Sequence, residues 1–202
     1  MKKIQWKISG GALIENVTAE MLIQDKTFSA ETLRKLYDET IAGSQKFLHK
    51  EEKFNRIGGR SATSVIAALL ALQDAGIREI DPEKTGILGI GRSGSHPENL
   101  RYWNDYDLNG RISGRGHYFV GTLASTPLCE VAITLGVRGP VLYLDPGKDA
   151  EALYQELYFY ESDCDRVLLC AVNLTHTRCL LLEKGTEERF PEMLREITGG
   201  LE

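Results

Sequence analysis

The segment from residue 61 to residue 75 constrains the fold most. If it forms a helix, that helix is apolar on nearly every side. Its centre reads VIAALLAL, and Gly76 follows as a stop signal typical of helix ends. An ordinary surface helix carries one apolar stripe, whereas a helix that is apolar all round has to be covered on most sides. We therefore predict a helix over 61–75 that lies inside the protein core.

Short apolar runs alternate with helical patterns along the rest of the chain. We expect strands at 4–8, 85–90, 141–144, 166–174 and 178–183, and helices at 30–42, 127–135 and 149–160. Ser29 is the expected cap of the first of these helices, and Thr126 that of the second. The pattern of residues 16–30 is irregular, and residues 49–60 are highly charged and read as a surface connection. Residues 91–116 have the polar, Gly-rich pattern of a long loop.

This alternation predicts an α/β fold with a mainly parallel five-stranded sheet, helices on both faces and a C-terminal antiparallel hairpin. The chain has 202 residues, enough for one domain with a sizeable core. We place that domain at 1–184 and a polar tail at 185–202.

Net charge, cysteine spacing and the lack of long apolar runs argue against several classes of protein. A net charge of −5 argues against nucleic-acid binding, which normally uses a basic face. The four cysteines fit neither a zinc site nor a redox pair, so we expect no metal and no cofactor. The N-terminus lacks an apolar signal core, and no apolar run approaches the ~20 residues that span a bilayer. We therefore expect a cytoplasmic protein.

Residues 135–153 read LGVRGPVLYLDPGKDAEAL. This stretch resembles the part of β-ketoacyl synthases in which a helix end and a buried strand lead to the nucleophile turn. In that family the turn is of the Thr-Ala-Cys type. Here it contains Asp145, Pro146, Gly147 and Lys148, and no cysteine lies between Cys129 and Cys164.

Other segments are similar to the same family in the same order. They are RIGGRSATSVIAALLALQDAGIREIDPEKTGILGIG (56–91), the stretch 104–136 and DRVLLCAVNL (165–174). The resemblance covers about residues 56–182 and implies the N-terminal half of a thiolase-like fold. It also implies a chain about half as long as a full ketosynthase, ending where the first half of that enzyme would end.

The resemblance implies a scaffold without the family's condensation chemistry. Ketosynthases use a thiolate to take the acyl chain and two histidines to stabilise the enolate and oxyanion. The family carries the histidines in its second half, so no catalytic residue is expected here. Two interpretations of this turn are open. Asp145 is a favoured helix cap, or either Asp145 or Lys148 projects into a partner's acyl tunnel and limits chain length.

The resemblance further implies a dimer. Its interface strand would be Val141, Leu142, Tyr143 and Leu144, and an apolar surface with Tyr118, Phe119 and Leu123 would complete the interface or the tunnel. The first hypothesis is a non-catalytic partner of an active β-ketoacyl synthase, similar to the chain-length factors of type II polyketide and aryl-polyene synthesis. This is a role in fatty-acid or polyketide chain elongation.

Two alternatives remain open. One is a stand-alone homodimer that binds an acyl-carrier protein or an acyl ligand. The other is an acyltransferase with relocated chemistry that uses His117 or Cys129.

Overall fold

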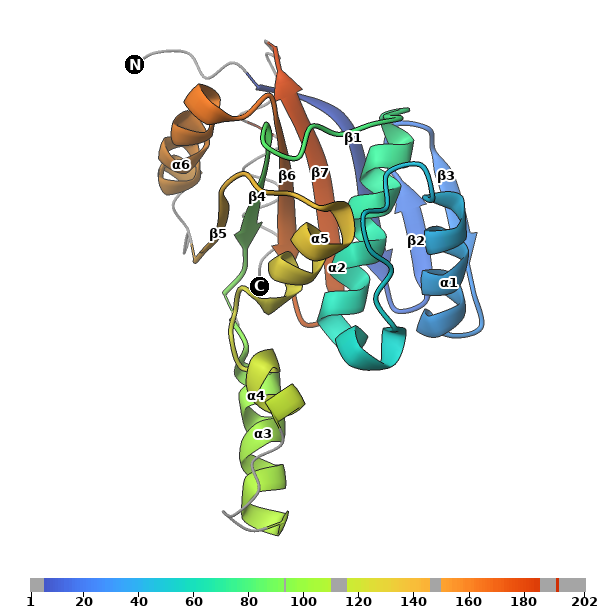
Figure 1. The fold of residues 1–202 in the computed structure, drawn as a ribbon, viewed down its shortest axis with the longest axis vertical. Helices are drawn as coiled ribbons and strands as arrows, with labels where there is room; N and C mark the ends of the chain where they lie inside the picture. The colour runs from blue at the N-terminus through green and yellow to red at the C-terminus, as the bar shows by residue number, and fades with distance from the viewer. Residues whose placement is uncertain (1–5, 93, 110–115, 146–149, 186–191, 193–202) are drawn as a thin grey trace.

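The computed structural model describes residues 6–92, 94–109, 116–145, 150–185 and 192. Within them lies one seven-stranded sheet of order β3-β2-β1-β7-β6-β4-β5 (Figure 1). Its strands are β1 (Trp6–Glu15), β2 (Thr18–Met21), β3 (Lys26–Ser29), β4 (Thr85–Ile90), β5 (Val141–Leu144), β6 (Arg166–Val172) and β7 (His176–Lys184).

The α/β class is confirmed, but the prediction of a mainly parallel five-stranded sheet is wrong. Only β5, β4 and β6 run parallel to one another. β7 pairs antiparallel with β6, as the predicted C-terminal hairpin requires, and β1, β2 and β3 continue the antiparallel part. The sheet is therefore mixed, with its parallel strands gathered at one edge.

The first strand is longer than predicted because Gly10 and Gly11 do not end it. β1 passes through both glycines, with an irregular register between Ile8 and Gly10. A Cβ at Gly10 would lie 2.3 Å from the backbone oxygen of Ala71. Glycine is therefore needed here for the close approach of β1 to the central helix.

The segment 16–30 is a strand hairpin, although its sequence looked irregular. Asn16 and Asp25 take positive φ values of 54° and 52°, which Asn and Asp tolerate better than other non-glycine residues. They stand at the two turns that flank β2. The expected cap Ser29 instead pairs with Thr18 across this hairpin.

The helices are α1 (Leu33–Gly43), α2 (Phe54–Asp74), α3 (His96–Asn109), α4 (Gly116–Gly121), α5 (Thr126–Leu135) and α6 (Ala150–Asp163). α1 is capped by Thr32, whose side chain accepts a hydrogen bond from the backbone of Lys35 at 3.2 Å. α5 begins after Ser125, one residue earlier than predicted, and ends at Gly136 in the left-handed conformation. The predicted long loop over 91–116 is wrong, since α3 occupies most of it.

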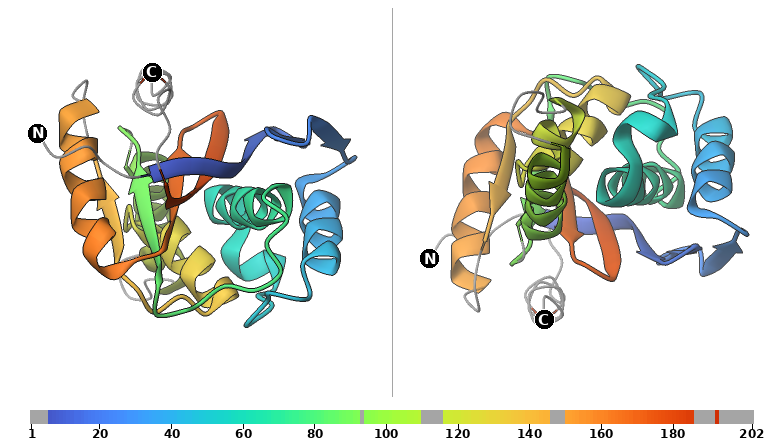
Figure 2. Two further views of the ribbon diagram at one scale, coloured as in Figure 1. Left: turned by 90° about the horizontal axis from the view of Figure 1, so that it is seen from above. Right: turned by 90° about the horizontal axis from the view of Figure 1, so that it is seen from below.

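Helices cover both faces of the sheet, as predicted (Figure 2). α2 lies in the larger core with α1 and α5, and α6 lies with the smaller core on the other face. The buried residues of α2 include all of VIAALLAL at 65–72, so the prediction of a covered helix is confirmed. Non-helical backbone at Gly58 and Gly59 separates this buried part from a first turn at Phe54.

Buried polar contacts fix these elements on one another. The indole of Trp6 in β1 donates a hydrogen bond to the backbone oxygen of Leu157 in α6 at 3.1 Å. The Tyr160 hydroxyl donates to the backbone oxygen of Ile87 in β4 at 2.9 Å. Both bonds satisfy groups that burial would otherwise destabilise.

α3 and α4 form an arm that projects away from the sheet and the other helices (Figure 1). α3 has no buried residue, unlike α2 and α5. Within the described part of the chain, no helix is long and apolar enough to cross a membrane. The predicted tail falls outside the described residues except for positions 185 and 192.

Candidate functional site

The three parallel strands end at one edge of the sheet, where ligands of α/β folds commonly bind. Gly91 follows β4, Asp145 follows β5 and Asn173 follows β6. The strands are in parallel register, with Ile90 opposite both Leu144 and Ala171. The predicted turn after 141–144 therefore begins at the carboxyl edge of the sheet.

Tyr143 links β5 to the residue that follows β4 at this edge. Its hydroxyl donates a hydrogen bond to the backbone oxygen of Gly91 at 2.7 Å. A Cβ at Gly91 would lie 2.8 Å from that hydroxyl and 2.7 Å from the backbone oxygen of Val172. A side chain at position 91 would thus separate the strand ends, and glycine lets them approach.

Burial raises the pKa of the Tyr143 phenol, and the Asp145 carboxylate acts in the same direction. Arg60 and a backbone hydrogen bond at Gly94 lower it. The net direction is upward, so Tyr143 is a neutral phenol at physiological pH and keeps its proton for Gly91. Asp145 itself is exposed.

Arg60 connects the start of the buried part of α2 to the arm. Its Nε donates to Glu98 of α3 at 2.9 Å, and a second guanidinium nitrogen contacts the other oxygen of Glu98. The Arg60 side chain also donates to the backbone oxygen of Gly94 at 2.7 Å. Only 13% of the Arg60 side chain is exposed, and paired guanidinium–carboxylate bonds of this kind are strong and directional.

Sequence reasoning missed Arg60 and Glu98 because it assigned both to connecting segments. The sequence around Glu98 nonetheless contains residues that favour the start of a helix. Pro97 stands in the first turn of α3, and Glu98 supplies the acidic residue favoured there. For Arg60, the preceding Gly58 and Gly59 suggested a connection, whereas the structure has a kink within α2.

The turn after β5, which the resemblance aligns with the nucleophile turn of ketosynthases, is only partly described. Pro146, Gly147 and Lys148 lie outside the described residues, and α6 begins at Ala150. The two interpretations of Asp145, as a helix cap or as a group in a partner's tunnel, therefore remain predictions.

β5, the predicted interface strand, is the last strand of the sheet. Its residues Val141, Leu142, Tyr143 and Leu144 pair with β4 on one side, and among the described residues no strand pairs with the other side. The Leu142 side chain is 46% exposed. An edge strand of this kind offers backbone donors and acceptors to a further strand.

The predicted apolar surface lies on the arm and just after it. Tyr118 and Phe119 belong to α4, and Leu123 follows it. Phe119 is 57% exposed and Leu123 is 54% exposed. Four other large apolar side chains on the arm are also exposed. They are Leu100, Trp103, Leu108 and Val120.

Aromatic contacts hold the arm together. The ring of Tyr102 meets Phe119 edge to face at 6.0 Å and stacks on Tyr106 at 6.0 Å, both measured between centroids. The Arg101 guanidinium lies 4.7 Å above the Tyr118 ring, a cation–π distance. We call the exposed set Leu100, Trp103, Leu108, Phe119, Val120 and Leu123 the arm surface.

The relocated-chemistry alternative rests on His117 and Cys129. The position of the His117 side chain lies outside the described part of the structure. Cys129 is exposed on α5, and its thiol makes no hydrogen bond or ion pair with the described residues. The other three cysteines are buried, and burial raises the pKa of Cys164 to about 11 and that of Cys179 well above its usual value. Thiols in this state are weak nucleophiles.

Within the described residues, no group of three or more His, Cys, Asp or Glu side chains is arranged to hold a metal ion.

Comparison with solved structures places this fold among ketosynthases. A ketosynthase in complex with its chain length factor from Xenorhabdus doucetiae matches with a TM-score of 0.58 and 15% identity, over 98% of this chain and 92% of the matched chain. The ishigamide ketosynthase/chain length factor matches with a TM-score of 0.54 and 13% identity, over 89% and 62%. A β-ketoacyl synthase from Burkholderia phymatum matches with a TM-score of 0.60 and 12% identity, over 90% and 59%.

The resemblance to β-ketoacyl synthases is thereby confirmed at the level of the fold. This chain spans nearly the whole of the matched chain in the first complex, and about three fifths of the matched chains in the other two. No protein-family model matches the sequence, and no curated protein sequence does.

Proposed function

We propose that this chain is a non-catalytic, ketosynthase-like subunit that pairs with an active β-ketoacyl synthase in acyl-chain elongation of the polyketide or aryl-polyene type. The observation that carries the proposal is Asp145 at the end of β5, where the resemblance places the nucleophile turn. A carboxylate cannot form the thioester on which condensation by a cysteine nucleophile depends. The partner would supply the cysteine and both histidines.

Two exposed features support pairing. The outer side of β5 offers a row of backbone groups at the edge of the sheet. The arm surface offers large apolar side chains on a pair of helices with no core of their own. Exposed apolar groups gathered in this way mark interaction sites in many proteins.

We assign the strand β5 to the subunit interface and the arm surface to the interface or to one wall of the acyl tunnel. Phe119 lies in α4 and Leu123 follows that helix, while Arg60 of α2 is bound to Glu98 of α3, the other helix of the arm. This ion pair would hold the wall in a fixed position relative to Asp145. The complexes of ketosynthases with chain length factors among the matched structures support an assembly of this kind.

The test is to tag the protein in its own organism, purify it gently, identify co-purifying proteins and record the native mass. The proposal predicts a stoichiometric ketosynthase at heterodimer mass. An Asp145→Cys variant of the isolated chain should remain inactive in condensation, because one cysteine does not supply the histidines. Condensation by that isolated variant would contradict the proposal.

A homodimer is the second candidate, because the outer edge of β5, which pairs with no described strand, could equally pair with its own copy. This subunit would bind an acyl-carrier protein or an acyl ligand without a ketosynthase. Recovery of a clean homodimer with no co-purifying ketosynthase would favour it over the first proposal.

A further inference from the structure

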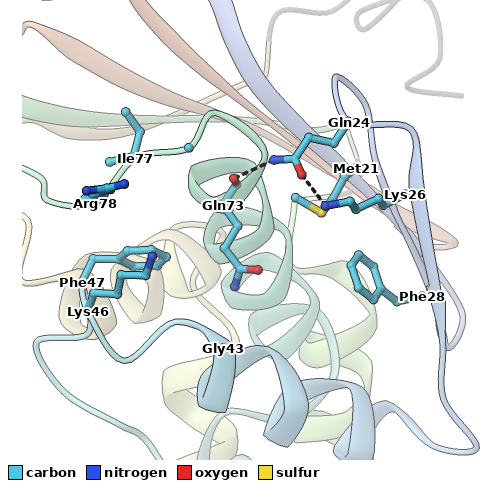
Figure 3. Close-up of a pocket in the computed structure, with 11 residues that line it drawn as sticks. Met21, Gln24, Lys26, Phe28, Gly43, Lys46, Phe47, Gln73, Ile77 and Arg78 are labelled. Carbon is cyan, nitrogen blue, oxygen red and sulfur yellow. Dashed lines mark hydrogen bonds between the residues drawn. The ribbon is translucent and has the colours of Figure 1, made fainter.

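A pocket of about 380 Å³ lies near the sheet edge opposite β5, among β2, β3 and the C-terminal ends of α1 and α2 (Figure 3). This volume falls within the range of small-molecule sites. Arg60, Glu98, Tyr143 and the residues of the arm surface are not among those that line the pocket. Binding at this pocket can therefore be tested separately from the pairing proposed above.

Three of the described residues that line the pocket are cations. They are Lys26 of β3, Lys46 after α1 and Arg78 after α2. None of its described lining residues is Asp or Glu, although the chain as a whole carries a net charge of −5. Lys46 and Arg78 form no ion pair with any described residue.

The two helix ends near the pocket do not cancel this charge. Each helix C-terminus contributes roughly half a negative charge. The ends of α1 and α2 together therefore offset about one of the three cations. The buried Asp74 carboxylate, which accepts a hydrogen bond from the backbone of the lining residue Gln24 at 2.8 Å, offsets up to one more. A smaller excess of positive charge remains among the described residues around the pocket.

One of the cations is held in place by neutral groups. The Lys26 ammonium donates to the side-chain oxygen of Gln24 at 2.7 Å. The Gln24 amide in turn donates to the backbone oxygens of Gln73 and Asp74, each at 3.0 Å. Because the partner of Lys26 is an uncharged amide, its positive charge is fixed in position without being neutralised.

Apolar side chains line the pocket beside the cations. Met21 and Phe47 are buried, and Phe28 is 39% exposed. Figure 3 shows Lys26, Met21 and Phe28 on one side of the pocket and Lys46, Phe47 and Arg78 on the other, with Gln73 between them. Rings and cations thus occur together on both sides.

We propose that this pocket binds a phosphate monoester that carries an apolar, ring-sized group. A phosphate monoester has a charge of about −1.5 to −2 at pH 7. This matches Lys46 and Arg78, neither of which forms an ion pair with a described residue, better than a carboxylate does. The apolar group would lie against the phenylalanine rings. The contact of the phosphate with the cations and the contact of the apolar group with the rings can therefore be tested separately.

The experiment measures binding of three probes by calorimetry and by amide chemical shifts. 1-Naphthyl phosphate should bind, and should shift the amides of Lys26, Gly43 and Gly76. 1-Naphthol and inorganic phosphate should each bind more weakly, since each lacks half of the ligand. Equal affinity for 1-naphthyl phosphate and inorganic phosphate, or no binding of either, would overturn the proposal.

Variants at exposed positions complete the test. A Lys46→Gln, Arg78→Gln double variant should weaken 1-naphthyl phosphate binding by about tenfold or more, because charge-assisted contacts are lost. Phe28→Ala should weaken 1-naphthyl phosphate but leave inorganic phosphate unchanged. Lys35→Gln is the matched control, since Lys35 pairs with Glu31 at the start of α1 and does not line the pocket. An equal loss in the control and the double variant would refute the site.

Discussion

The guanidinium of Arg60 and the carboxylate of Glu98 join the buried helix α2 to the arm, with the Arg60 Nε 2.9 Å from one Glu98 oxygen. α3 buries no residue of its own, so packing alone does little to fix it. The same Arg60 side chain binds the backbone of Gly94 in the connection between β4 and α3. One arginine therefore orients the arm relative to the carboxyl edge of the sheet.

Glu98→Gln should loosen the arm. The substitution removes a charge-assisted pair in which Arg60 is largely buried, and we expect a loss of about 1–3 kcal/mol in the free energy of unfolding. Amide hydrogen exchange in α3 should become faster, and urea denaturation should report the global loss.

The matched control is Glu83→Gln, which removes an exposed pair with Arg138. Exposed pairs contribute about 0–1 kcal/mol, so this variant should be nearly neutral. Equal effects of the two substitutions would show that the Arg60 contact does not hold the arm.

Leu142→Glu should reduce assembly of the proposed complex. Leu142 lies on the edge strand β5 and is 46% exposed, so the substitution should leave the subunit folded while placing a charge at the proposed interface. Native mass measurements of the co-purified protein should show a smaller assembled fraction than for the unaltered chain.

Ile23→Glu is the corresponding control. Ile23 is 58% exposed in the connection between β2 and β3, near the opposite edge of the sheet. It should leave assembly unchanged. Unchanged assembly of the Leu142 variant would remove β5 from the interface.

The buried helix and the short parallel strands could be predicted from the sequence because each carries a run of apolar residues. The run VIAALLAL and the strands 85–90 and 141–144 are apolar where the structure buries them or pairs them. β3 left no such pattern, since all four of its residues are exposed. α3 left none for the same reason, because it has no core-facing stripe.

The candidate site was predictable only in part. Asp145 does follow the strand 141–144, as the chain order requires. The contact of Arg60 with Glu98 joins segments that are 38 residues apart, and that of Tyr143 with Gly91 spans 52 residues. Neither carries a local signature, because these pairs are set by how the helices and strands pack.

Glu130→Gln should stabilise the protein at neutral pH. Burial raises the pKa of Glu130, the Glu52 carboxylate raises it further, and Lys50 lowers it. A raised carboxyl pKa means that the folded state binds the proton more tightly than the unfolded state. This group therefore favours folding at acid pH, and that contribution is lost as pH rises through the folded pKa.

The variant should have a higher urea midpoint than the unaltered chain at pH 7, and the difference should shrink as pH falls. Glu39→Gln, at an exposed position on α1, provides the control and should show no such trend. A gain for Glu130→Gln that is constant across pH would rule out titration of this carboxyl as the cause.

Asp74→Asn should destabilise the junction of β1, α2 and the connection between β2 and β3. The buried Asp74 carboxylate accepts three backbone N–H bonds, from Gly11 at 2.9 Å, Ile23 at 2.9 Å and Gln24 at 2.8 Å. An asparagine keeps one oxygen and turns an amide donor toward a backbone donor. Leaving a buried donor unpaired costs about 1–3 kcal/mol, and hydrogen exchange at these three amides should accelerate.

Asp81→Asn makes the same chemical change at an exposed carboxylate, which accepts from the backbone of Glu83 at 2.9 Å and Lys84 at 3.3 Å. Water can replace these bonds, so the loss in unfolding free energy should stay below about 1 kcal/mol. The contrast between the two variants isolates the effect of burial. A loss of equal size at Asp74 and Asp81 would mean that the buried carboxylate does not hold β1 and the β2–β3 connection against α2.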